Sequence, residues 1–124
     1  MAKHRVLVVD DDEDIRESLR DFLEDHGYET SGAGHGREAL EQLVGPEIRP
    51  CLIILDLMMP VMDGKTFRDE QVRDPLLADI PVIIISAFRD SANMARELHV
   101  PNHLPKPLNL DLLLEMIQEN CLQN

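Results

Sequence analysis

The chain has 124 residues, 44% of them hydrophobic, which is enough for one domain with its own core but not for two. With 24 acidic and 12 basic residues, its formal net charge is -12. This charge argues against direct nucleic-acid binding, which needs a cationic face, and against an anionic membrane surface as partner. An acidic chain is better suited to metal cations and to basic protein surfaces.

The sequence contains neither a disulfide framework nor a recognisable targeting segment. We expect Cys51 and Cys121 to be two reduced, partly buried thiols of a cytosolic protein. Residues 1–5 are polar, and the apolar run behind them is too short for a signal peptide. No apolar stretch approaches the ~18 residues of a transmembrane helix, so we expect a soluble, cytoplasmic protein.

The first half of the chain alternates strands with helices. Residues 6–9 form an apolar run rich in β-branched side chains, which is typical of a strand buried on both faces. A helix with an apolar stripe follows, and Gly27 is placed to end it. Its stripe is Ile15, Leu19, Phe22 and Leu23. Residues 29–33 predict a weaker strand, and a second, shorter helix follows it. The stripe of that helix is Ala39, Leu40 and Leu43.

The second half repeats this alternation. Apolar runs at residues 52–55 and 82–85 predict buried strands, and residues 102–104 predict a weaker one. The helix expected over residues 65–73 has a poor apolar pattern, and the one over 91–98 is short. The last helix has a well-formed stripe of Leu110, Leu113, Leu114, Ile117 and Cys121. Five such alternations, without a linker or second domain, predict a parallel sheet with helices on both faces.

Polar residues follow the predicted strands at the edge where such sheets bind ligands. They are Asp10, Asp11 and Asp12 after the first strand, Asp56 after the third, Ser86 after the fourth and Lys106 after the fifth. Taken singly, the acidic run reads as a solvated helix start, Ser86 as a strand-end hydroxyl and Lys106 as a surface lysine. Their occurrence after four different strands favours a shared site.

That set of side chains has a chemical logic. Clustered carboxylates repel unless a cation lies among them, and their oxygens suit Mg²⁺. A carboxylate such as Asp56 can attack phosphorus and form an aspartyl phosphate. The ammonium of Lys106 and the hydroxyl of Ser86, together with Mg²⁺, can then neutralise the phosphoryl oxygens.

Four segments of the chain resemble the receiver domains of two-component response regulators. The strongest is LDLMMPVMDG at residues 55–64, and the others are residues 6–16, 80–87 and 104–107. They occur in the family's order and cover essentially the whole chain, which we therefore take as a single receiver domain over residues 1–124. The resemblance implies a flavodoxin-like (βα)5 three-layer sandwich with strand order 2-1-3-4-5.

The resemblance also implies how the acidic residues divide their work. Asp56 would be the phosphoacceptor. Mg²⁺, with Mn²⁺ as an alternative, would be held by Asp11, Asp56 and the backbone carbonyl of Met58, and by Asp10 through a water molecule. Met58 and Phe88 would tune the lifetime of the phosphorylated state.

Further positions would respond to phosphorylation. Lys106, Ser86 and Ala87 would contact the phosphoryl group, and the Lys106–Pro107 peptide bond is expected to be cis by analogy. His103 stands at the switch position, where the family often has Tyr or Phe, and imidazole is smaller and titratable. This departure and the short helix over residues 91–98 predict an unusual output face.

Two further features of the sequence concern a candidate metal site and a candidate partner surface. His99 and His103 have a helical metal-site spacing, but Pro101 lies between them and argues against a shared face. Leu112 and Met116 lie off the main stripe of the last helix, and form either a partner-binding patch or ordinary exposed residues.

The implied function is a signalling switch. A histidine kinase or histidine phosphotransfer protein would donate a phosphoryl group to Asp56, and the change would alter binding of an output protein or effector domain that the sequence does not identify. The chain would catalyse its own phosphorylation and slow dephosphorylation without being an enzyme on an external substrate. The alternatives are a Mg²⁺-dependent aspartyl-phosphate phosphatase, against which Met58 counts because such enzymes carry an acid there, and an interaction module that is never phosphorylated.

Overall fold

The computed structural model describes residues 4–44, 49–57, 62–87 and 91–121. Strands and helices alternate along this part of the chain. They are β1 (Arg5–Val9), α1 (Glu13–Asp25), β2 (Glu29–Ala33), α2 (Gly36–Leu43), β3 (Leu52–Asp56), α3 (Gly64–Arg73), β4 (Val82–Ser86), α4 (Ser91–Glu97), β5 (Asn102–Pro105) and α5 (Leu110–Asn120). The strands pair in parallel in the order β2-β1-β3-β4-β5, which confirms the expected fold. No helix within the described ranges is both long and apolar enough to cross a membrane.

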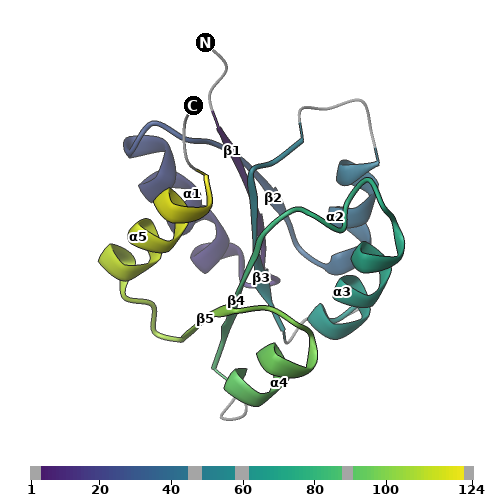
Figure 1. Cartoon of the computed structure of the whole chain (residues 1–124). Coiled ribbons are helices and arrows are strands. Elements are labelled where there is room, and N and C mark those ends of the chain that lie inside the picture. Colours follow the sequence, from purple (N-terminus) through teal and green to yellow (C-terminus); the bar gives the residue numbers. More distant parts are fainter. Residues whose placement is uncertain (1–3, 45–48, 58–61, 88–90, 122–124) are drawn as a thin grey trace.

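Two layers of helices cover the sheet. α1 and α5 lie on one face, and α2, α3 and α4 lie on the other (Figure 1). In β3, Leu52 and Ile54 point into the core beneath α1 and α5, while Ile53 and Leu55 point into the opposite core. Every residue of this strand is buried, which explains why its apolar run does not alternate with polar residues.

Side-chain caps fix where the helices begin. The carboxylate of Asp12 accepts a hydrogen bond from the Ile15 N–H at the start of α1, and Asp63 and Asn109 cap α3 and α5 in the same way. α1 ends where expected, because Gly27 just beyond it has a φ of 92°, a left-handed conformation that glycine adopts readily. The acidic run behind β1 thus leads directly into a capped helix.

The third helix is regular, although its apolar pattern is poor. Its buried residues include Phe67 and the polar Gln71, whereas the apolar Val72 is 47% exposed. Gln71 Nε2 donates to the carbonyls of Leu77 and Ile80 at 2.9 and 3.0 Å. A hydrogen-bonded glutamine therefore fills a core position that apolar periodicity cannot detect.

The fourth helix is short, as predicted, with seven residues. It ends in a turn where His99 has a φ of 58°. Arg68 on α3 donates from Nε to the Leu98 carbonyl at 3.1 Å and from Nη2 to the His99 carbonyl at 3.3 Å. Burial lowers the pKa of the Arg68 guanidinium below its usual range. The arginine thus satisfies carbonyls that a longer helix would have used internally.

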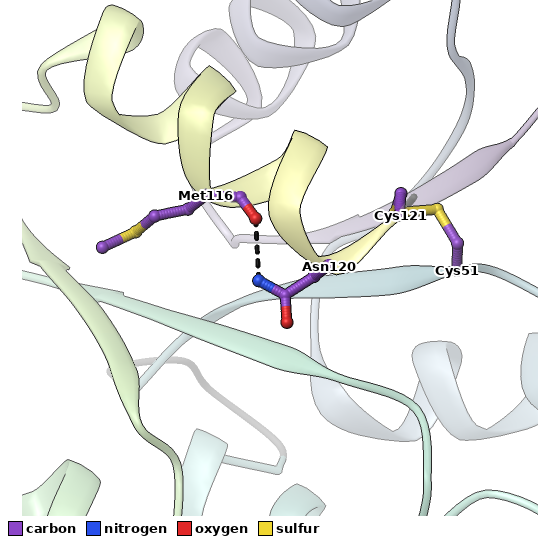
Figure 2. The surroundings of a disulfide bond; sticks show 4 residues. All are labelled: Cys51, Met116, Asn120 and Cys121. Atoms are coloured by element: carbon purple, nitrogen blue, oxygen red, sulfur yellow. Dashed lines mark hydrogen bonds between the residues drawn. A yellow bond between two sulfur atoms is a disulfide. The ribbon is translucent and has the colours of Figure 1, made fainter. Parts of the chain in front are cut away.

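The expectation of two reduced cysteines is wrong. Cys51 at the start of β3 and Cys121 at the end of α5 form a disulfide, with a Cα–Cα distance of 5.5 Å (Figure 2). They are separated by 70 residues, so a cysteine count could not reveal the pairing. It arises because α5 runs back over the sheet and ends beside the amino end of the central strand.

Candidate functional site

The candidate site lies at the carboxyl edge of the sheet, where the predicted residues occupy neighbouring strand ends. Asp10 directly follows β1, and Lys106 directly follows β5. Asp56 is the last residue of β3 and Ser86 the last of β4. Asp56 lies opposite Ile85 in the register, so Ser86 lies one residue further along on the adjacent strand. The topology therefore brings these side chains to one edge, as the sequence predicted.

Three carboxylates gather there. Asp10 and Asp56 are buried, with 0% and 3% exposure, whereas Asp11 is exposed. One carboxylate oxygen from each residue lies within 4.8 Å of the others. Buried negative charges this close repel, and a cation among them relieves the repulsion. Because the donors are all hard oxygen atoms, the cluster can bind a divalent metal ion of the Mg²⁺ type.

Lys106 bridges the two buried carboxylates. Its Nζ lies 3.0 Å from Asp10 Oδ2 and 3.3 Å from Asp56 Oδ2. Desolvation acts to lower the pKa of Lys106, but the hydrogen bonds and negative charges of Asp10 and Asp56 outweigh it, and the pKa is raised above its ordinary value. Lys106 therefore stays a cation, placed beside the carboxylate that was predicted to accept phosphorus.

Hydrogen bonds hold the acidic loop behind β1. The Asp10 N–H donates to the Ala33 carbonyl at 3.0 Å, and Asp10 Oδ1 accepts from the Asp12 N–H at 2.9 Å. Arg16 Nη1 donates to the Asp10 carbonyl at 2.9 Å. Arg16 is thus a positioning residue that sequence analysis did not single out. Its inclusion in the matched segment 6–16 was the one signal pointing to it.

Gly64 lets α3 approach the end of β3 closely. A Cβ at this position would lie 2.8 Å from Leu57 Cα and 2.9 Å from the Asp56 carbonyl oxygen. The Gly64 N–H also donates to the Leu57 carbonyl at 3.1 Å. The glycine that ends the LDLMMPVMDG segment is therefore needed for close backbone contact. The sequence pattern alone does not predict this role, because it depends on backbone atoms of β3 and of the residue after it.

The ends of β4 and β5 are joined beside the acidic cluster. Ser86 is buried, and its carbonyl accepts a hydrogen bond from the Lys106 N–H at 3.0 Å. Ala87, the next residue, is exposed. The Lys106–Pro107 peptide bond is cis, which confirms that prediction.

His103 lies in the edge strand β5, on the face that carries α4. Its register partner, Ile84, belongs to the core beneath α2, α3 and α4, whereas the neighbouring Leu104 belongs to the core beneath α1 and α5. The imidazole is partly exposed. A small polar side chain therefore stands on the face of the sheet that α4 helps to cover.

The remaining predicted positions are Met58, Phe88, the pair His99 and His103, and two residues of α5. Met58 and Phe88 lie outside the described residues. His99 lies in the turn after α4 and His103 in a strand, and no candidate metal cluster in the described part of the chain includes either residue. The two histidines therefore do not share one helical face, as the intervening Pro101 predicted. On α5, Leu112 is exposed, and Met116 is partly buried against the core.

The comparison with known families agrees with this geometry. A family model described as the response regulator receiver domain matches residues 6–118. The chain belongs to this family. A receiver domain is the phosphoryl-accepting module of two-component signalling, so the phosphatase and the unphosphorylated interaction module are not favoured.

Curated relatives carry the receiver domain as part of longer proteins. The chain is 37% identical over 115 residues to the response regulator RR06 of Streptococcus pneumoniae, which covers 91% of this chain and 51% of the relative. It is 40% identical over 113 residues to the response regulator MprA of Mycolicibacterium vanbaalenii, covering 89% and 47%. The chain thus spans about half the length of these relatives.

Solved structures share the receiver fold. The chemotaxis response regulator CheY4 of Vibrio cholerae matches with a TM-score of 0.84 at 30% identity, covering 96% of this chain and 99% of that one. The response regulator TrrA of Thermotoga maritima, solved in complex with Mg²⁺ and BeF, matches with a TM-score of 0.82 at 30% identity, covering 94% and 98%.

Proposed function

We propose that Asp56 accepts a phosphoryl group from a histidine kinase or a histidine phosphotransfer protein and that this switches the binding of an output protein or effector domain. The observation that carries the proposal is the position of the Asp56 carboxylate. It is buried at the strand edge, close to two further carboxylates and 3.3 Å from the Lys106 ammonium. A carboxylate that is buried beside other charges is typical of a functional site, whereas carboxylates that keep a protein soluble lie on its surface.

The donor set fits a Mg²⁺ ion, with Mn²⁺ as the alternative. Asp11 and Asp56 would bind it directly, and Asp10 through a water molecule. The complex of TrrA with Mg²⁺ and BeF supports this assignment for a relative of 30% identity. When bound, such an ion neutralises charge on the phosphoryl oxygens and orients them for transfer.

The chain's own residues then have separate tasks. An Asp56 carboxylate oxygen attacks phosphorus, the bond from phosphorus to the donor's imidazole nitrogen breaks, and the electron pair stays on that nitrogen. Lys106 Nζ, already within 3.3 Å of Asp56 Oδ2, donates to the negatively charged group that arrives. The Asp10 loop, anchored by Arg16, keeps the neighbouring carboxylates in place.

Switching would follow from the same edge. Ser86 ends β4 and Ala87 follows it, and the carbonyl of Ser86 accepts a hydrogen bond from the Lys106 N–H. A phosphoryl group that accepts hydrogen bonds from Lys106 and Ser86 would shift the conformation at the ends of β4 and β5. His103 and the short α4 would move with these strand ends. The output face would lie there.

We assign no turnover of an external substrate to the chain. It would catalyse its own phosphorylation and a slow autodephosphorylation. The chain spans about half the length of its curated relatives. We therefore propose an output domain and a cognate kinase as its partners. We also propose a cytoplasmic location.

Intact mass after treatment with acetyl phosphate and Mg²⁺ tests the site and the class together. Wild type should gain one phosphoryl group, and Asp56→Asn should gain none. Asp21→Asn is the matched control, because it removes an exposed carboxylate from the middle of α1. It should label like wild type, and a chelator should abolish labelling in both. Equal labelling of Asp56→Asn and wild type would overturn the assignment.

A further inference from the structure

The disulfide lies at the amino end of the sheet, away from the acidic site. Cys51 directly precedes β3, and Asp56 ends the same strand. Five residue steps of a strand span about 16 Å, so the sulfur atoms and the phosphoacceptor are well separated. Figure 2 shows Cys121 at the end of α5 bonded to Cys51. The bond therefore ties the last turn of α5 to the central part of the sheet.

The non-covalent contacts described for that last turn are apolar packing and hydrogen bonds within α5. The buried face of α5 consists of Leu113 and Ile117, followed by Cys121 just beyond the helix. The last turn contains no basic residue, and it carries Glu119, whose charge opposes the negative end of the helix dipole. The Cys121 N–H donates to the Ile117 carbonyl at 2.8 Å, which closes the helix locally but gives it no hold on the sheet.

Asn120 adds a further local bond. Its Nδ2 donates to the Met116 carbonyl at 2.7 Å (Figure 2). This bond also lies within α5. The disulfide, by contrast, fastens the last turn covalently to the residue before β3.

The surroundings also suit the thiol form, once the two sulfur atoms move from bonding distance to van der Waals contact. Cys121 is 4% exposed within the apolar core beneath α1 and α5, and Cys51 packs partly buried against that core. A free cysteine in such surroundings behaves as a small apolar side chain. Reduction would therefore break the tie without leaving a cavity or a buried charge, and the fold can persist in both states.

We propose that Cys51 and Cys121 form a reversible redox site, independent of the acidic edge, that fastens or releases the last turn of α5. Its reactants are small thiols and disulfides of the glutathione type. In reduction, a thiolate bonds to one protein sulfur, the Sγ–Sγ bond breaks, and the other sulfur leaves as a thiolate and takes up a proton. A second thiol resolves the mixed disulfide, so two thiols are oxidised to one disulfide as the protein gains two S–H groups.

The geometry assigns an order to this exchange. Cys51 is partly exposed and lies outside any helix, whereas Cys121 is buried. An incoming thiolate therefore reaches Cys51 first. Cys121 then has to leave as a thiolate in apolar surroundings at the negative end of a helix, which makes it a poor leaving group. We expect slow exchange, so a redox titration has to be approached from both directions.

The first test is the titration of the wild-type chain in glutathione buffers, quenched by alkylation and read by intact mass. The expected result is a two-electron transition between a species with no alkyl groups and one with two, identical from either direction. A persistent adduct of glutathione on Cys51, or two alkyl groups throughout the oxidising range, would overturn the proposal.

The second test is amide hydrogen exchange of α5 in the oxidised and reduced wild-type chain, which needs no variant. Reduction should speed exchange in the last turn of α5 by about tenfold or more, with α1 as the internal reference. The Cys51→Ala/Cys121→Ala variant should match the reduced chain under both conditions. Equal exchange of α5 in both redox states would show that the bond fastens nothing.

Discussion

At the carboxyl end of the sheet Lys106 bridges two buried carboxylates, whereas at the amino end a disulfide joins the start of β3 to the end of α5. The first arrangement depends on charge, so its strength changes whenever a metal ion, a proton or a phosphoryl group arrives. The second is covalent and lies in apolar surroundings, so it does not respond to charge. β3 connects the two, because Cys51 precedes it and Asp56 ends it.

This difference suggests how the molecule can switch without loosening. Changes at the carboxyl edge act on loops and strand ends, where few apolar contacts are lost. The amino end and the two cores remain fixed, and they provide the rigid base that a switch needs. If that division holds, changes at one end should leave the other end's properties intact.

The largest effect is expected at the amino end. The Cys51→Ala/Cys121→Ala variant should lose about 2–5 kcal/mol of unfolding free energy, because the disulfide closes a long loop in the unfolded chain. Urea unfolding of the oxidised wild type and the variant measures this loss. The rate at which acetyl phosphate labels the variant should equal that of wild type. A variant that unfolds normally but labels much more slowly would show that the two ends are coupled.

A smaller effect is expected from adding a methyl group at Gly64, beside Asp56. In Gly64→Ala the new Cβ would meet the backbone of Asp56 and Leu57 at under 3.0 Å, so α3 has to shift. We expect a loss of about 1–3 kcal/mol and slower labelling, because the shift displaces the end of β3. Gly34→Ala is the matched control.

At Gly34 the nearest atoms to an added Cβ lie at 3.7 Å, an ordinary contact distance. Unfolding free energy and labelling rate should both stay near wild type in this control. If Gly64→Ala were as stable and as rapidly labelled as Gly34→Ala, the close approach of α3 would have no part in shaping the site.

The carboxyl edge was largely readable from the sequence, for a physical reason. Uninterrupted apolar runs mark strands buried on both faces, and parallel strands all end at one edge. The residues after each run therefore had to converge, and Asp10, Asp56, Ser86 and Lys106 do so. Their individual roles came from resemblance to a family, because a strand end alone does not say which carboxylate reacts.

Features that depend on tertiary contacts were not readable. The disulfide can be predicted only once the path of α5 over the sheet is known. Gln71 occupies a core position of α3, although a polar residue there weakens the apolar pattern expected of a helix. Arg16 and Gly64 act through backbone atoms of Asp10 and Leu57, which no side-chain pattern records. In each case the deciding partner is distant in sequence or is a backbone group.

The smallest effect concerns the charge of Lys106. Its pKa is raised above 10.5, its ordinary value, so its stabilising contribution is fully present below pH 10.5 and is lost as the pH rises through the folded-state pKa. Without divalent ions, Lys106→Met should be less stable than wild type at neutral pH by roughly 1 kcal/mol, because water partly screens the pairs. The difference should shrink above pH 10.5 as wild type loses its charge.

Urea unfolding in a chelator, from pH 7 to the alkaline limit of folding, measures this difference. Burial also raises the pKa of Tyr28, so stability falls in the same alkaline range for every variant, and the comparison with wild type cancels that part. Lys65→Met is the control, since Lys65 is exposed on α3 and makes none of the described ion pairs. If both lysine variants followed one pH profile, charge would not be what holds the carboxyl edge, and the contrast between the two ends of the sheet would fail.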